Sequence, residues 1–334
     1  MSSETPARRN FSRLLQWLGP LLILVFVTGL FIGLLAWKDR EGLNAFLSLR
    51  NFKTVLIQTV IVAIGSLGMT MIIVSGGIDL SVGSVIALTS VLGAVLLKEN
   101  YGSTVTIAVT VLAGGLIGLL NGSLIAGFRM MPFIVTLGTL GVARGAAKWL
   151  AGNQTVNADS IPNSFVAKLM QDPDLESLRL PPGLLAVIGL AALMTLVMGR
   201  TVFGRHVFAL GSNEATARLC GIRTRRMKLL IYGISGLFIG LAGVMQLSRL
   251  RQGDPTAAIG LELDIIAAVV IGGASLSGGT GSIPGSMIGA LTMAVLRTGS
   301  QYMDWPNYMQ EIIIGILIIL AVGLDKWRQN RTTP

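Results

Sequence analysis

Long runs of apolar residues recur along the whole chain, separated by short segments in which glycine, proline and charged residues gather. Within the runs, apolar residues do not alternate with polar ones, which favours helices over the strands of a membrane β-barrel. A helix needs about 20 apolar residues to cross a bilayer at right angles, and the pattern predicts about ten such spans. They are placed at 18–37, 55–75, 78–97, 104–128, 133–150, 183–198, 227–247, 263–273, 283–297 and 312–324.

The composition fits this pattern. The chain has 334 residues, of which 52% are hydrophobic and 13% are charged, whereas a soluble domain carries about a quarter charged residues. The 42 glycines suit close packing of membrane helices, because small residues let two backbones approach. We predict an all-α polytopic membrane protein with one membrane domain at 18–325, an N-terminal segment at 1–17 and a C-terminal tail at 326–334.

The net charge of +10 is concentrated beside apolar runs. Its three groups are Arg8, Arg9 and Arg13; the segment 200–228; and Lys326, Arg328 and Arg331. This placement follows the positive-inside rule, which marks cytoplasmic ends of spans. It does not suit a nucleic-acid interface, which would need a soluble basic face.

The charge pattern also predicts the topology. With ten spans, both termini lie in the cytoplasm, and the basic loop 200–227 lies there too. The loop 152–182 is then external. It is acidic in character, because it contains Asp159, Asp172, Asp174 and Glu176.

Two glycine-rich segments share the pattern GGxxLSxG, at 76–83 and at 272–279. Broken helices at corresponding places in a transporter mark its pathway, and the backbone groups that they free must be satisfied by protein or water. We therefore expect the framework of a translocation pathway to contain Gly76, Gly77, Asp79, Ser81, Gly272, Gly273 and Ser277.

Charged residues in or near apolar runs offer a second interpretation. Asp79 follows a helix break, and a structural role for it is favoured over solute contact. Glu262 and Asp264 are expected at the open outer mouth of their span, with Arg144 reaching toward the same side. An ion-coupled secondary transporter could instead use Asp79 or the pair Glu262/Asp264 to carry protons.

The basic loop contains a candidate short helix. Ser212 or Asn213 can cap its start, Glu214 suits its first turn, and Gly221 can end it. We expect one face to carry Ala215, Leu219 and Ile222. Such a helix could lie on lipid headgroups or dock into a groove of a partner protein.

The sequence gives little support for a catalytic site or a metal site. The chain has one cysteine, Cys220, and one histidine, His206, so a disulfide framework and a Cys/His metal site are excluded. Cys220 is expected to be a buried or interfacial hydrophobe. The chain also lacks the GxxxxGK[ST] pattern of a phosphate-binding loop. We expect neither an ATPase nor any other enzyme, and no cofactor held by this chain.

Four ordered motifs carry a resemblance to a known family. They are GGIDLSVG at 76–83, PFIVTLG at 132–138, GSNEATARLCGI at 211–222 and ELDIIAAVVIGG at 262–273. From about residue 50 to its C-terminus, the chain resembles the ribose/xylose-type sugar permeases of ABC (ATP-binding-cassette) importers.

The resemblance implies a fold similar to that of the cobalamin-importer permease, and import of a monosaccharide, with a pentose favoured. It implies a bacterial inner membrane, a second permease copy that is identical or different, a periplasmic or extracellular sugar-binding protein, and cytoplasmic ATPases that hold ATP and magnesium. It also implies a coupling helix that contacts the ATPase through Asn213, Glu214, Ala217, Arg218, Gly221 and Ile222.

Overall fold

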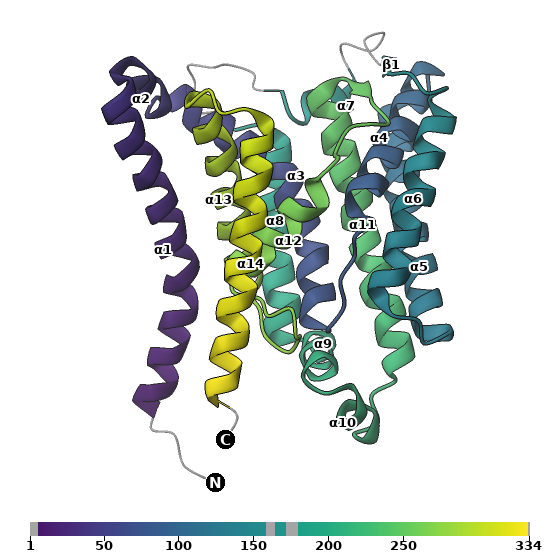
Figure 1. Ribbon diagram of the computed structural model, residues 1–334. Coiled ribbons are helices and arrows are strands. Elements are labelled where there is room, and N and C mark those ends of the chain that lie inside the picture. Colours follow the sequence, from purple (N-terminus) through teal and green to yellow (C-terminus); the bar gives the residue numbers. More distant parts are fainter. Residues whose placement is uncertain (1–5, 158–163, 172–179, 333–334) are drawn as a thin grey trace.

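The computed structural model describes residues 6–157, 164–171 and 180–332. Within these ranges the chain forms helices and one short strand pair (Figure 1). The helices are α1 (Pro6–Lys38), α2 (Arg40–Phe46), α3 (Leu49–Val74), α4 (Val82–Lys98), α5 (Ser103–Gly127), α6 (Pro132–Leu150), α7 (Phe165–Lys168), α8 (Pro182–Arg200), α9 (Val202–Ser212), α10 (Glu214–Leu219), α11 (Thr224–Leu250), α12 (Leu261–Ile271), α13 (Ile283–Tyr302) and α14 (Asn307–Thr332). The strands β1 (Val156–Asn157) and β2 (Gln252–Gly253) pair antiparallel.

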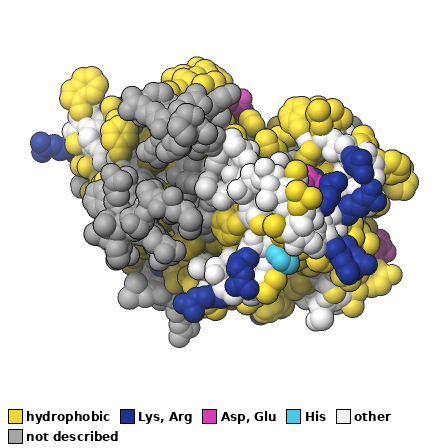
Figure 2. All heavy atoms as spheres, turned by 90° about the horizontal axis from the view of Figure 1, so that it is seen from below, with side chains coloured by type: hydrophobic (Ala, Val, Ile, Leu, Met, Phe, Trp, Pro, Cys, Tyr) yellow, Lys and Arg dark blue, Asp and Glu magenta, His cyan; other side chains and the backbone are white. Residues whose placement is uncertain are grey.

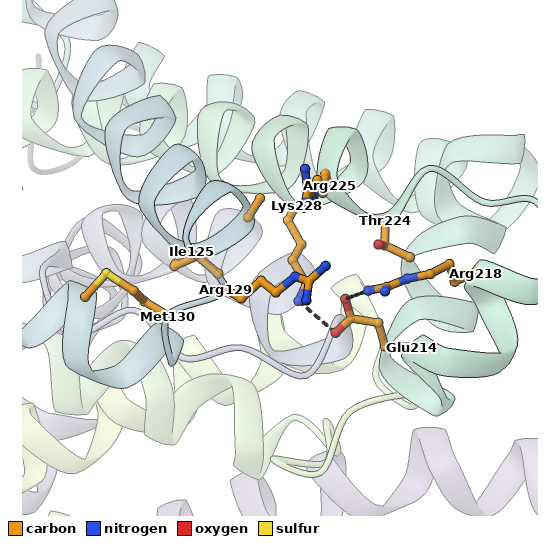
Figure 3. A pocket seen from close by; sticks show the side chains of 9 residues that line it. Ile125, Arg129, Met130, Glu214, Arg218, Thr224, Arg225 and Lys228 are labelled. Carbon is orange, nitrogen blue, oxygen red and sulfur yellow. Dashed lines mark hydrogen bonds and ion pairs between the residues drawn. The ribbon is translucent and has the colours of Figure 1, made fainter.

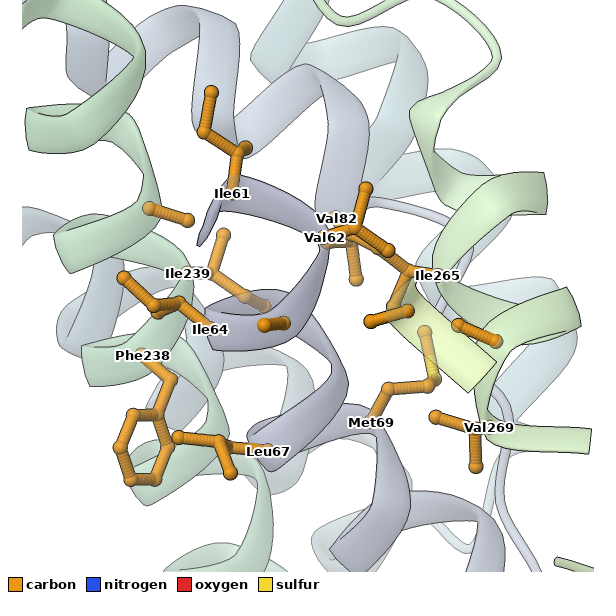
Figure 4. Close-up of a cluster of buried hydrophobic side chains, with 14 of the residues drawn as sticks. Ile61, Val62, Ile64, Leu67, Met69, Val82, Phe238, Ile239, Ile265 and Val269 are labelled. Carbon is orange, nitrogen blue, oxygen red and sulfur yellow. The ribbon is translucent and has the colours of Figure 1, made fainter. Parts of the chain in front are cut away.

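Helix α3 forms the centre of the bundle. Its most apolar stretch is 89% buried, as expected for a helix that is hydrophobic on all sides. Ile64 and Leu67 of α3 lie in the same apolar cluster as Phe238 of α11 and Ile265 of α12 (Figure 4). The core is therefore built from segments that are far apart in the sequence.

Glycines bring α5 and α11 together. A Cβ atom placed on Gly114 would lie 2.5 Å from the carbonyl oxygen of Gly236, and one on Gly240 would lie 2.8 Å from that of Thr110. The two backbones are thus in direct contact, which is how membrane helices pack closely.

Each of the ten predicted ranges falls on a helix, but the helices differ in their capacity to span a bilayer. Among the described residues, five helices are long and apolar enough: α3, α5, α8, α11 and the part Leu18–Lys38 of α1. By contrast, α12 has 11 residues and a length of about 16 Å, which is too short for a full span. The total of ten spans remains a prediction.

The two ends of the bundle differ. The start of α1, the end of α14, and helices α9 and α10 lie at one end, which we call the α10 end (Figure 1). Helices α2 and α7 and strand β1 lie at the opposite end, the α7 end. The basic loop 200–227 thus lies at the same end as the start of α1 and the end of α14, and basic side chains gather on the described part of its surface (Figure 2).

Some predicted boundaries change. Helix α1 already begins at Pro6 and α14 continues to Thr332, so the segments 1–17 and 326–334 are largely extensions of these helices. The predicted acidic residues Asp159, Asp172, Asp174 and Glu176 of the loop 152–182 lie outside the described residues.

Candidate functional site

The short helix in the basic loop is capped as predicted. The side chain of Asn213 accepts a hydrogen bond from the amide of Thr216 over 2.9 Å, which satisfies a free amide of the first turn. Gly221 follows the helix with a φ of +83°, and the amide of Ile222 bonds back to the carbonyl oxygen of Ala217 over 3.1 Å. These bonds define α10 as a separate element.

The predicted apolar face of this helix lies away from the bundle, since Ala215 and Leu219 are exposed and Ile222 is partly exposed. Ala217 is the buried residue, whereas Leu219 is 89% exposed and Cys220 is exposed. Helix α10 has only six residues, so the direction in which it leaves α9 decides which side faces the bundle, and side-chain periodicity does not. The exposed Leu219 leaves an apolar contact point at the α10 end.

Ion pairs connect α10 to the bundle. Glu214 accepts hydrogen bonds from Lys228 of α11 over 2.8 Å and from Arg218 of α10 over 3.5 Å (Figure 3). The sequence predicted roles for Glu214 and Arg218 but not for Lys228. Lys228 reaches Glu214 only because the turn between α10 and α11 folds the start of α11 back beside α10.

Helix α9, which the sequence analysis did not predict, joins α10 to both helix breaks. A Cβ atom on Gly211 would lie 1.8 Å from the carbonyl oxygen of Val74 and 2.7 Å from the amide nitrogen of Gly279. One on Gly278 would lie 3.0 Å from the Cα atom of Gly76. We call this meeting of Gly76, Gly211, Gly278 and Gly279 the glycine junction. It places both predicted breaks against the end of α9.

The two breaks are alike in structure as well as in sequence. Gly76 and Gly273 both have positive φ, of +82° and +90°. In each break the amide of the next residue bonds to a carbonyl oxygen five residues earlier, over 2.9 and 3.1 Å, which is a Schellman ending. The structural equivalence is shifted by one residue from the sequence repeat, because Gly76 corresponds to Gly273 and not to Gly272.

A buried hydrogen-bond network fixes the first break. The carboxylate of Asp79 is 1% exposed and accepts bonds from the amide and the hydroxyl of Ser81 over 2.8 and 2.6 Å. Asn121 of α5 donates to the Ser81 hydroxyl over 3.2 Å, and Thr139 of α6 donates to Asn121 over 2.6 Å. This geometry suits a structural role for Asp79, since its bonds hold the start of α4.

The second break packs against α13. A Cβ atom on Gly272 would lie 2.5 Å from the backbone of Gly285, and the amide of Ser277 donates to the hydroxyl of Ser275 over 3.2 Å. The framework residues predicted from sequence therefore lie in two loops that meet near the α10 end, and none of them lies in α10 itself.

The expectation that Asp264 lies at an open mouth is wrong. Asp264 is 1% exposed, and Arg297 of α13 donates a hydrogen bond to its carboxylate. Glu262 is also partly covered, because its carboxylate lies against Gly83 at the start of α4. Helix α12 begins beside α13 and α4, so the first-turn acids turn into the bundle. Arg144 reaches the α7 end as expected, where it donates to the carbonyl oxygens of Pro255 and Ala257 over 2.8 Å each.

Comparison with known proteins identifies the family. The model of the family described as "Branched-chain amino acid transport system / permease component" matches residues 51–322. The chain belongs to this permease family.

Relatives of this permease cover nearly its whole length. The ribose import permease protein RbsC of Escherichia coli K12 is 36% identical over 284 residues, which are 85% of this chain and 88% of the relative. RbsC of Bacillus subtilis is 34% identical over 319 residues, 96% and 95% of the two chains. The xylose transport system permease protein XylH of Escherichia coli K12 is 33% identical over 345 residues, 86% and 88% of the two chains. No solved structure matches, so the likeness to the cobalamin-importer permease stays a prediction.

Family membership separates the two interpretations left by the sequence. The permease is a multi-pass membrane protein, because it has several apolar helices of spanning length and belongs to a family of membrane permeases. Its family supports a transport subunit over an ion-coupled carrier. The acids Asp79 and Asp264 that such a carrier would need are engaged by Ser81 and Arg297.

Proposed function

We propose that this chain is the transmembrane permease subunit of an ATP-driven importer and forms the translocation pathway for a monosaccharide, with a pentose favoured. Relatives of similar length are named for ribose import, for xylose transport and for an L-arabinose ABC transporter. A fructose permease relative extends the class to hexoses. These names support a sugar over the amino acid in the family description.

One structural observation carries the mechanism. Helix α10 follows directly on α9, and the end of α9 contacts both helix breaks in the glycine junction. A partner that moves α10 would therefore act on both breaks at once. In our proposal this partner is an ABC ATPase that holds ATP and magnesium, so no cofactor and no catalytic group is needed in this chain. The residues proposed to contact it are Asn213, Glu214, Ala217, Arg218, Gly221 and Ile222.

The proposal also assigns the two ends. The α10 end, with both termini and the loop 200–227, faces the cytoplasm of a bacterium, and the permease lies in the inner membrane. The α7 end, with the loop 152–182, receives the sugar from a binding protein. A second permease copy, identical or different, completes the pathway. The framework of the pathway is the pair of breaks, with Gly76, Gly77, Asp79, Ser81, Gly272, Gly273 and Ser277.

Co-purification and transport test this function. The tagged chain is extracted from its native membrane in mild detergent, and its companions are identified by mass spectrometry. We expect an ATPase with a phosphate-binding loop in fixed ratio, and uptake of ribose, xylose or arabinose into proteoliposomes that requires ATP and the binding protein. Uptake driven by an ion gradient without ATP would overturn the proposal.

A further inference from the structure

A cavity of about 210 Å³ lies between the α5–α6 turn and the start of α11, beside α10 (Figure 3). We call it the basic cavity. Its lining comes from three separate parts of the chain and consists of Ile125, Ala126, Arg129, Met130, Glu214, Arg218, Thr224, Arg225 and Lys228.

The charges of the basic cavity are unbalanced. Four of the lining residues are cationic and one, Glu214, is anionic. Glu214 already pairs with Lys228 and Arg218. Within the described ranges no carboxylate pairs with Arg129 or Arg225. The cavity therefore suits an anion that can accept several hydrogen bonds, as a phosphate group does.

The backbone conformation at the end of α5 presents Arg129 to the cavity. Arg129 has a φ of +57°, a left-handed conformation that favours glycine and is uncommon for other residues. The position directly follows the end of α5, where glycine is usual. Asn100 and Asp304 adopt the same conformation after α4 and α13, so it is a usual way for a helix of this chain to end. Here that position carries a guanidinium group into the lining of the cavity (Figure 3).

The surroundings indicate which anion this is. The last turns of α5 and the turn after it expose large apolar side chains: Leu120 is 62% exposed, Phe128 is 76% exposed and Met131 is 69% exposed. Ile125 and Met130 continue this apolar surface into the cavity lining. Cations beside an apolar surface, at the end of a spanning helix, match the two parts of a lipid molecule.

We propose that the basic cavity binds the phosphate group of an anionic phospholipid, with its acyl chain along the exposed end of α5. The phosphate competes with Glu214 for Lys228 and so loosens the connection between α10 and α11. The proposal that a lipid binds here depends only on the cavity and its surroundings. Its effect on coupling rests on the proposed function, because only there does the freedom of α10 affect transport.

The test compares two double variants of the full chain, each purified with its partners. Arg129→Gln/Arg225→Gln removes two charges from the cavity. The matched control, Arg223→Gln/Arg226→Gln, removes two exposed charges of the same loop that do not line it. Each protein is placed in bilayers of phosphatidylcholine with phosphatidylglycerol, and the retained phosphatidylglycerol is measured by native mass spectrometry. Each basic side chain near an anionic lipid strengthens binding about fivefold, so loss of both should weaken retention about 25-fold in the cavity variant.

Two further arms identify the source of the phosphate and separate strain from binding. Inorganic phosphate added to a pure phosphatidylcholine bilayer should not replace the lipid in lowering ATP-driven uptake. Arg129→Gly should raise the melting temperature, because it relieves the left-handed strain, and should still reduce lipid retention. A purely structural role of Arg129 would not produce that combination.

Three outcomes would overturn the proposal: equal retention by the two double variants, full replacement of the lipid by inorganic phosphate, or loss of the ATPase instead of the lipid in the cavity variant. The last outcome would assign the basic cavity to an acidic segment of the partner. If the wild-type chain retains phosphatidylglycerol but shows no ATP-driven uptake in any bilayer, the lipid site stands and the proposed function fails.

Discussion

Glu214 of α10 and Lys228 of α11 are joined by a hydrogen-bonded ion pair of 2.8 Å between their carboxylate and ammonium groups. The Lys228 side chain is 22% exposed and that of Glu214 is 40% exposed. Together with the Asn213 cap, this pair fixes where a six-residue helix sits at the α10 end. A helix this short has too little packing of its own to hold a fixed position.

The ion pair is expected to affect coupling more than stability. A partly exposed pair contributes up to about 1 kcal/mol, so Glu214→Gln should leave the melting temperature nearly unchanged. ATP-dependent uptake should fall, because α10 loses its connection to α11. The charge swap Glu214→Lys/Lys228→Glu should restore part of the uptake. Uptake of Glu214→Gln at the wild-type rate would contradict this role.

The glycine junction should tolerate no side chain. Gly211→Ala would place a methyl group 1.8 Å from the carbonyl oxygen of Val74, and such overpacking costs about 1–3 kcal/mol. We expect a lower melting temperature and loss of uptake. Gly138→Ala in α6 is the matched control, since a Cβ atom there meets nothing within 4 Å. Equal melting temperatures for the two variants would show that the junction is not tightly packed.

The Asp79 network should act as a structural support. Asp79→Asn keeps Oδ1, which accepts both bonds from Ser81, but replaces Oδ2 by a donor NH2 group, and a buried donor without an acceptor costs about 1–3 kcal/mol. The melting temperature should fall, and the dependence of uptake on the proton gradient should not change. A variant that folds normally but loses a dependence on the proton gradient would instead identify Asp79 as a proton carrier.

The Asp264–Arg297 pair should be sensitive to loss of either partner. Arg297→Met leaves the buried Asp264 carboxylate without its cation; breaking a fully buried pair costs about 3–5 kcal/mol, and the cost here should be smaller because the Arg297 side chain is 39% exposed. The double variant Asp264→Leu/Arg297→Met should recover most of this stability, because neither charge remains. Thermal unfolding in detergent measures both. A double variant as unstable as Arg297→Met would show that Asp264 is stabilised by other groups.

Local patterns predicted much of this molecule. The apolar runs predicted the positions of the long helices, and the cap at Asn213 and the stop at Gly221 followed from the chemistry of single residues. The burial of Asp264 could not be read in the same way, because it depends on how α12 meets α13. The glycine junction was equally hidden. The sequence showed two similar breaks, but that they meet at Gly211 is a property of tertiary packing.

The construction of that junction limits the kind of force it can transmit. At this junction three backbone segments touch without intervening side chains, so no rotamer change could absorb a displacement of α9. The hydrogen bond from Gly279 to Val74 joins one break to the other. Among the described residues, no hydrogen bond joins Gly211 to either break. The contact between α9 and the two breaks therefore rests on packing without hydrogen bonds, so in the proposed function α9 would act on the breaks by pressing against them and not by pulling on them.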